Sequence, residues 1–191
     1  MRDGSTGLAF TKKIREREIR EIFRYWLECR PRGSVPDRGS IDPKTIPHEY
    51  LPNLFLYEHE PEGRFRCKLI GTDIARILGK DETGRYLDEM LDPAVVKERL
   101  DLFEQTVTSG RPVYYRYHAI AGRGERRLFS RILLPVSSGR GKADQVFGMV
   151  RYGPMENPAM DRNSRAAGSR LLQVVTATDD DLAAPTDSAV K

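Results

Sequence analysis

The sequence predicts an α+β domain in which a five-stranded antiparallel sheet carries helices on one face, with an amphipathic helix added at the N-terminus. Two observations predict this arrangement. Segments rich in β-branched and aromatic residues are joined by short turns, which favours antiparallel neighbours. Two other segments repeat apolar residues every three or four positions, which is the spacing of one helix face.

The first helix is predicted over residues 11–30. Its apolar residues form one stripe, which consists of Ile19, Ile22, Phe23, Trp26 and Leu27. Pro31 and Gly33 follow and end the helix. Such a stripe has to be buried, so we expect it either to cover the domain's own sheet or to pair with a second copy in a homodimer. It is the candidate interaction surface of the chain.

The sheet is predicted within a domain over residues 31–154. A proline-rich loop leads into a hairpin, in which Phe65 and Cys67 alternate with basic residues and therefore share one face. The hairpin strands span 54–57 and 64–71. Short helical turns (73–78 and 86–90), a helix (93–109) and three further strands (113–121, 126–136 and 146–152) follow.

Both ends of the chain are predicted to be disordered, over residues 1–10 and 155–191. Asparagine, proline, glycine, alanine and aspartate dominate the second of these segments. Its single apolar patch, residues 171–175, is interpreted as a chance run, with a docking segment as the alternative.

Charge gives little indication of a nucleic-acid partner. The chain carries 32 Lys and Arg against 28 Asp and Glu, a net charge of +4. Basic residues gather early, over 12–24, but acidic ones interrupt them, which is typical of a solvated helix face. Nucleic-acid binding through this helix stays the alternative. There is no apolar leader at the N-terminus and no run of about 18 apolar residues, so we expect a cytoplasmic protein with no membrane partner.

No residue pattern indicates catalysis or a metal site. His48, His59 and His118 are far apart, and Cys29 and Cys67 form no CxxC pair, so both cysteines are expected to be free thiols. No Ser/His/Asp or Cys/His set has supporting context. We therefore predict no catalytic, cofactor-binding or metal-ligating residues and no enzyme, a small α+β enzyme being the weakest alternative.

A ligand cavity is possible between the sheet and its helices. Alternation places Tyr115 and Tyr117 on one face of their strand. The candidate cavity set is Phe65, Cys67, Tyr115, Tyr117, Ser130 and Ile132. Ordinary core packing without a cavity is the alternative, and which face points inward stays open.

Several stretches resemble the PAS-type domain family common in alphaproteobacteria, formerly a domain of unknown function. They include LPNLFL (51–56), RFRCKLIGT (64–72), IGTDIARILGKDETGR (70–85), LLPV (133–136) and VFGM (146–149). The order of strands and helices is also that of PAS domains. The resemblance covers roughly residues 20–152.

The resemblance implies a sensory or protein-interaction module in bacterial signalling. Members often stand alone, so the output would pass to an unidentified signalling protein, with a small-molecule ligand or a homodimer as further expectations. Haem is not expected, because haem-binding relatives supply a histidine from the helical region, and residues 73–109 contain none. Covalent flavin is not expected either, because light-sensing relatives carry a cysteine where residues 71–78 have none.

Overall fold

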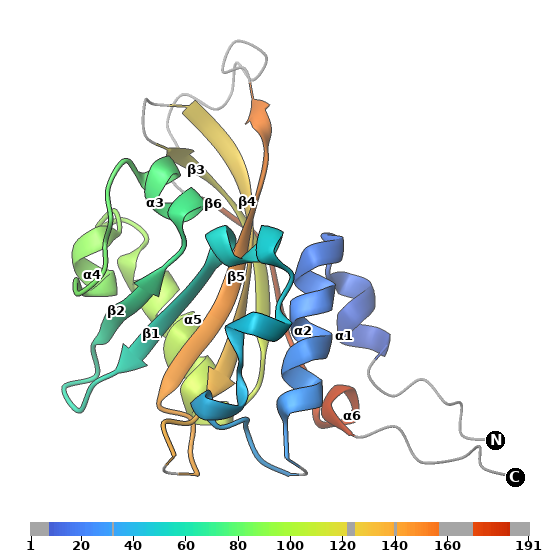
Figure 1. Cartoon of the computed structure of the whole chain (residues 1–191). Helices are drawn as coiled ribbons and strands as arrows, with labels where there is room; N and C mark the ends of the chain where they lie inside the picture. The colour runs from blue at the N-terminus through green and yellow to red at the C-terminus, as the bar shows by residue number, and fades with distance from the viewer. Residues whose placement is uncertain (1–7, 32, 122–124, 140, 157–169, 184–191) are drawn as a thin grey trace, which may run out of the picture.

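The computed structural model describes residues 8–31, 33–121, 125–139, 141–156 and 170–183, and it confirms the α+β class (Figure 1). One antiparallel sheet forms the centre, with helices on both of its faces. The sequence predicted helices on one face and left the N-terminal helix unplaced. The structure places that helix on the opposite face.

The sheet has six strands rather than the predicted five, in the spatial order β2-β1-β5-β4-β3-β6. The strands are β1 (Leu54–His59), β2 (Phe65–Ile70), β3 (Val113–Ala121), β4 (Glu125–Val136), β5 (Gln145–Glu156) and β6 (Arg170–Thr176). All pairings are antiparallel. Directly opposed residues lie on the same face, so the register fixes the direction of each side chain.

Successive residues of β4 point to the two faces in turn. We call the face that carries Phe129 and Leu133 the inner face. It is covered by α3 (Thr72–Leu78), α4 (Leu87–Met90) and α5 (Val96–Ser109). Helix α5 was predicted from residue 93. It begins three residues later, because Asp92 first accepts a bond from the Ala94 amide in a turn.

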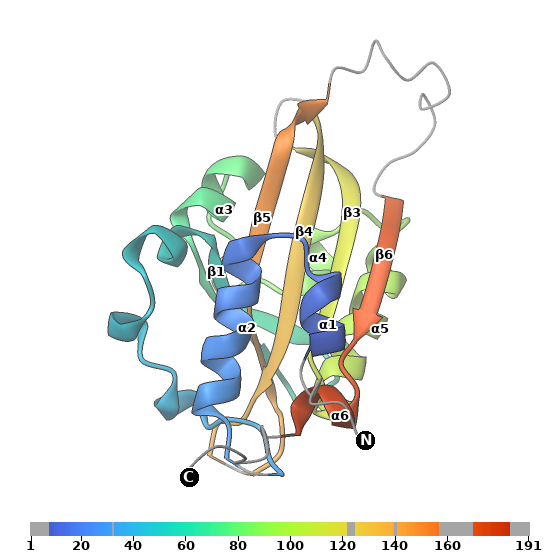
Figure 2. The ribbon, with the colours of Figure 1, turned by 90° about the vertical axis from the view of Figure 1, so that its right-hand side faces the viewer.

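The other face, which carries Ile132 and Leu134, is the cap face. It is covered by α1 (Leu8–Lys13) and α2 (Arg17–Cys29), which stand in front of the sheet in Figure 2. We call these two helices together the cap. The predicted single helix is therefore two helices. They are separated at residues 14–16, where the Arg20 guanidinium donates to the carbonyls of Ile14 (2.9 Å) and Arg15 (3.0 Å).

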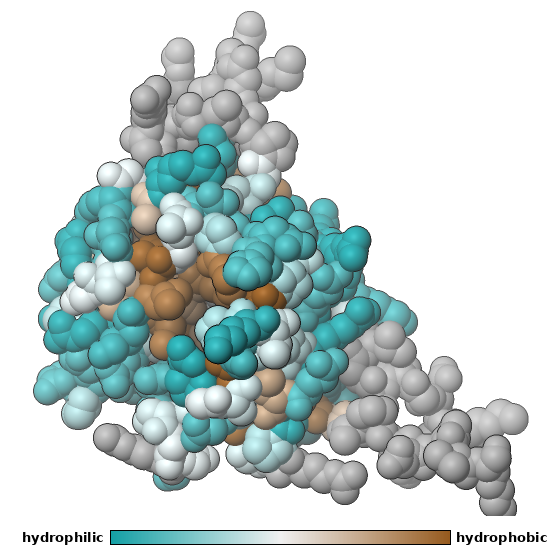
Figure 3. Space-filling view, viewed as in Figure 1, coloured by the Kyte–Doolittle hydropathy of each residue, from teal (hydrophilic) through white to brown (hydrophobic). Residues whose placement is uncertain are grey.

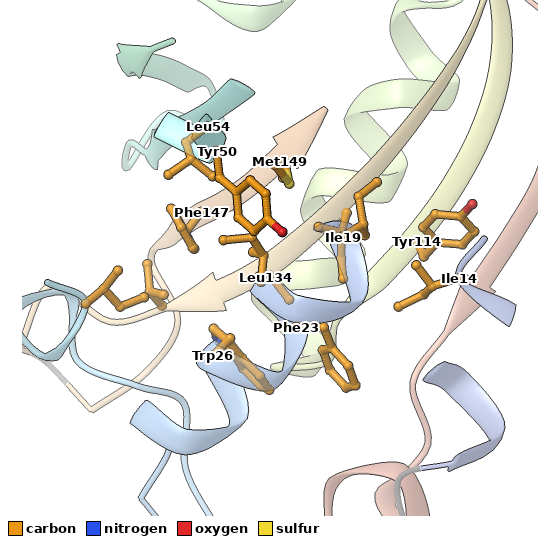
Figure 4. Packing of buried hydrophobic residues seen from close by; sticks show 14 of the residues in the cluster. Ile14, Ile19, Phe23, Trp26, Tyr50, Leu54, Tyr114, Leu134, Phe147 and Met149 are labelled. Carbon is orange, nitrogen blue, oxygen red and sulfur yellow. The ribbon is translucent and has the colours of Figure 1, made fainter. Parts of the chain in front are cut away.

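The predicted apolar stripe packs against the chain's own sheet (Figure 4). Ile19, Ile22, Phe23 and Trp26 are all at most 1% exposed, and Leu27 is partly buried. Trp26 also donates its indole N–H to the carbonyl of Pro135 at 2.9 Å. Of the two uses that the sequence allowed, the structure shows intramolecular burial, so the stripe is not free to bind a second chain in this arrangement.

The proline-rich loop covers the rest of α2 with three short 3₁₀ helices, at Arg38–Ser40, Pro43–Thr45 and His48–Asn53. Ile41 and Ile46 directly follow the first two of these helices, and Tyr50 lies within the third. All three side chains enter the core beside α2.

The structure differs from the expected disordered tail at residues 170–183. Strand β6 pairs with β3, and α6 (Asp179–Leu182) follows it. The carboxylate of Asp181, 5% exposed, accepts bonds from the amides of Phe10 and Thr178, both 2.9 Å long. This segment therefore ties the C-terminal part of the fold to α1. The disorder predicted for residues 1–7, 157–169 and 184–191 lies outside the described residues.

Candidate functional site

The inner face of the sheet is lined mainly by aromatic side chains from strands β1 to β5. The set includes Phe55, Tyr57, Phe65, Cys67, Tyr115, Tyr117, Phe129 and Tyr152. Helix α5 contributes Phe103, whose ring centroid lies 5.3 Å from those of Tyr57 and Phe65. Edge-to-face packing of this kind is favourable for aromatic pairs and fixes the position of α5 on the sheet.

The structure brings together four of the six predicted cavity residues. Phe65, Cys67, Tyr115 and Tyr117 lie on the inner face. The other two do not. Ser130 bonds to Glu16 between the two cap helices, and Ile132 belongs to the core beneath α2. The register explains the error, because Tyr115 stands opposite Arg131 and Tyr117 opposite Phe129.

Arg131 places a guanidinium among these rings. Its Nη1 donates to the Tyr115 hydroxyl at 3.4 Å, and its central carbon lies 5.0 Å from the Phe55 ring centroid. The residue as a whole is partly exposed, but its Nε is buried and has no hydrogen-bond partner. Among the residues that the structure describes, no carboxylate lies within ion-pair distance of Arg131. Its charge is therefore balanced by rings and hydroxyls alone.

Tyr152 supplies a second polar atom of the same kind. It stands opposite Phe129 on β5, and its hydroxyl is buried without a hydrogen-bond partner. Burial raises the pKa of Tyr152, Tyr57 and Tyr115 above the ordinary tyrosine value. All three are therefore protonated at neutral pH and can donate a hydrogen bond.

Another arginine on this face, which is fully buried, already has an acidic partner. Arg99 of α5 is 2% exposed and lies 4.4 Å from the Tyr117 ring centroid. Its Nη1 bonds to the Glu98 carboxylate at 2.6 Å. Arg99 thus has a carboxylate partner, whereas Arg131 has none among the described residues.

The model of the PAS domain family matches residues 14–151, which is most of the chain. The chain belongs to the PAS domain family. No curated protein matches it. Among solved structures it is similar to a domain of an HTR-like protein from Haloarcula marismortui, with 20% sequence identity and a TM-score of 0.38, over 53% of this chain and 97% of that one. The family and the PAS fold that the sequence predicted are thus confirmed.

On the cap face of this PAS domain, a polar cluster lies directly behind Arg131. Glu16, between α1 and α2, accepts bonds from the Tyr114 hydroxyl (2.7 Å) and the Ser130 hydroxyl (2.6 Å). Arg116 Nε lies 3.8 Å from the same carboxylate and donates to Ser130 at 3.3 Å. We call these four residues the cap latch. It fastens the turn between the cap helices to β3 and β4.

A cavity of about 590 Å³ lies elsewhere in the PAS domain, where α5 ends beside α6 and the β4–β5 connection. None of the six predicted cavity residues lines it. Two of its lining arginines are already engaged: Arg30 donates to the Leu182 carbonyl and Arg111 to the Asp179 carboxylate, both at 2.7 Å. These bonds connect α6 to the ends of α2 and α5.

Part of the cap face has no helix over it. Figure 3 shows an apolar area over β1 and β2, beside α2. Leu69 stands opposite Leu56 on this face and is 44% exposed.

The described residues contain no cluster of three His, Cys, Asp or Glu side chains that could hold a metal ion. Within the same residues, no helix is long and apolar enough to cross a membrane. Among the early basic residues, Arg17 bonds to Glu21 within α2 at 2.6 Å. An acidic residue of the same helix, Glu18, bonds to Arg151 of β5 at 2.8 Å.

Sequence reasoning missed Arg131, Tyr152 and the cap latch. Arg131 could have been found by pairing the two strands of the β3–β4 hairpin. Directly opposed residues share a face, and Arg131 stands opposite Tyr115. Glu16 gave no such indication, since it sits among other charged residues of a helical pattern.

Proposed function

We propose that this PAS domain is a sensory module of bacterial signalling that binds a small molecule on the inner face and passes its state to a partner protein. One observation carries the proposal: two buried polar atoms, Arg131 Nε on β4 and Tyr152 Oη on the adjacent β5, lie on one face without a hydrogen-bond partner. Buried polar groups in proteins nearly always have a hydrogen-bond partner. These two atoms lack one within the protein, which favours a bound small molecule as the partner.

Strand β4 supplies a route from this site to the cap. Arg131 faces inward, while its neighbours Ser130 and Ile132 contact Glu16 and the core beneath α2. A shift of Arg131 toward a ligand would therefore act on the cap latch across a single peptide unit. We propose the cap as the output element, because its release would expose the apolar stripe that α2 now buries.

Catalysis is not part of the proposal. Cys67 is the thiol on the inner face, and burial raises its pKa to about 11. A thiol with that pKa stays protonated at neutral pH and is a poor nucleophile.

Native mass spectrometry of the purified full chain tests the function, with a denatured sample as the control. We expect an additional mass that is lost on denaturation. Hydrogen exchange of the same sample, before and after removal of that molecule, should show a change in protection at α1 and α2. A sensory role would be contradicted if repeated preparations showed only the mass of the protein chain, and if no compound of a library changed the hydrogen-exchange protection of α1 and α2.

A further inference from the structure

We infer that the inner-face ligand is a small carboxylate with a single negative charge, held by Arg131; this rests on the proposed function. The starting observation is the charge of the site. A guanidinium that is removed from water is unfavourable unless an anion pairs with it. Arg131 acts electrostatically on Tyr57 and Tyr115, whose pKa values burial raises, so neither hydroxyl carries a charge at neutral pH.

Two carboxylates that act on inner-face residues are already paired. Glu98 bonds to Arg99 at 2.6 Å. Asp73 of α3, which acts electrostatically on Tyr152, bonds to Arg76 at 2.7 Å. The positive charge of Arg131 is thus left without a carboxylate partner among the described residues. One negative charge would balance it, whereas a phosphate dianion would leave an excess charge in an apolar surrounding.

The donors match the acceptors of a carboxylate. A guanidinium presents its N–H groups in a planar fork that fits the two oxygens of a carboxylate. Nε is the unpartnered nitrogen of Arg131, and Tyr152 adds a hydroxyl donor. The neighbouring rings of Tyr115, Tyr117 and Phe129 are stacked, with centroids 5.5 and 5.1 Å apart. Such a surface suits a flat apolar body attached to the acid group.

The test compares acids with their neutral amides by isothermal titration calorimetry on the full chain. The probes are acetate with acetamide, benzoate with benzamide, 4-hydroxybenzoate with 4-hydroxybenzamide, and inorganic phosphate. We expect at least one acid to bind roughly 10- to 100-fold more tightly than its amide, because the amide loses a charge-assisted pair. Phosphate should bind more weakly than that acid.

Two variants locate the binding and one controls for it. Arg131→Met fills a similar volume without charge and should abolish the preference for the acid. Tyr152→Phe should weaken binding of the acid more than that of the amide, because the lost hydroxyl bond is charge-assisted only with the carboxylate. Arg111→Met is the matched control, because Arg111 pairs with Asp179 at the other end of the fold and should bind as the wild type does.

The outcomes separate this inference from the proposed function. Equal affinity for an acid and its amide, together with unchanged binding by Arg131→Met, would overturn the inference. The sensory function would still stand in that case. Binding of none of the acids would also overturn it, with ordered water as the partner of the two buried atoms. The proposed sensory function itself would be contradicted if native mass spectrometry showed no bound molecule and the protein bound no compound of the library.

Discussion

The cap latch should contribute measurably to stability, and Glu16→Ala tests this. Glu16 is partly buried, with 21% of its side chain exposed, and it accepts two short hydroxyl bonds. Hydrogen bonds to a charged group are each worth about 1.5–3 kcal/mol. Because the site is partly open to solvent, we take the lower end and expect the substitution to reduce the free energy of unfolding by about 2–3 kcal/mol.

The measurement is urea unfolding at 25 °C, followed by the fluorescence of Trp26. Trp26 is the single tryptophan of the chain and is fully buried beneath α2, so its emission reports detachment of the cap as well as global unfolding. Asp101→Ala is the matched control. Asp101 accepts one bond from Lys97 on the surface, with 63% of its side chain exposed, and its loss should cost only a few tenths of a kcal/mol, roughly 0.3.

A double-mutant cycle isolates the contact itself. Ser130→Ala combined with Glu16→Ala should show a coupling energy of about 1–2 kcal/mol, because the two side chains share one bond. A coupling energy near zero, or a Glu16→Ala variant as stable as Asp101→Ala, would refute the idea that the latch holds the cap to β4.

Three further predictions follow from the same contacts. Without ligand, Arg131→Met should be as stable as the wild type or more stable, by up to about 2 kcal/mol in urea unfolding, because it removes a charge without a carboxylate partner; a clear loss would show that Arg131 is already well compensated. Burial, together with the bond to Glu16, raises the pKa of Tyr114 to about 12, so the unfolded chain loses this proton first and stability should fall between pH 10 and 12. Tyr114→Phe should remove about 2 kcal/mol of that fall, and parallel pH profiles of the two proteins would contradict the assignment. Gly148→Ala should cost about 2–4 kcal/mol or prevent folding, because its Cβ would lie 2.1 Å from the Ile132 carbonyl oxygen and 2.4 Å from the Phe55 ring; wild-type stability would contradict the close approach of these strands.

The sequence was sufficient for the elements whose residues alternate or repeat cleanly. Strand β2 alternates apolar and basic residues, so the shared face of Phe65 and Cys67 followed from it. The stripe of α2 was equally clear, because a charged face and an apolar face are separated along one helix. What the sequence left open was the surface that the stripe covers, since a partner and the chain's own sheet bury it equally well.

Strand β4 was ambiguous for a physical reason. Both faces of the sheet are covered, so the run from Ile132 to Val136 is buried on both sides and shows no alternation. The sequence therefore did not show which residues of β4 point to which face, and Ser130 was assigned to the wrong one. The prediction of disorder at β6 was wrong for the opposite reason. This edge strand has one neighbour and its residues stay half exposed, as Leu172 does at 45%, so the sequence shows little burial there.

Helices cover both faces of the sheet, so β4 contacts the inner-face site on one side and the cap on the other. The same arrangement lets a change at the site reach the cap. A ligand can shift the cap only if it binds two arrangements of the protein with different affinities. The expected coupling energy of the Glu16–Ser130 contact, about 1–2 kcal/mol, corresponds to a shift of roughly 5- to 30-fold between an attached and a detached cap. The cap also holds Ile19 and Trp26 out of water, so complete detachment would need far more energy than this contact supplies. A small displacement at the α1–α2 turn, rather than release of the whole cap, is therefore the response that a ligand at Arg131 could produce without a partner to cover the exposed stripe.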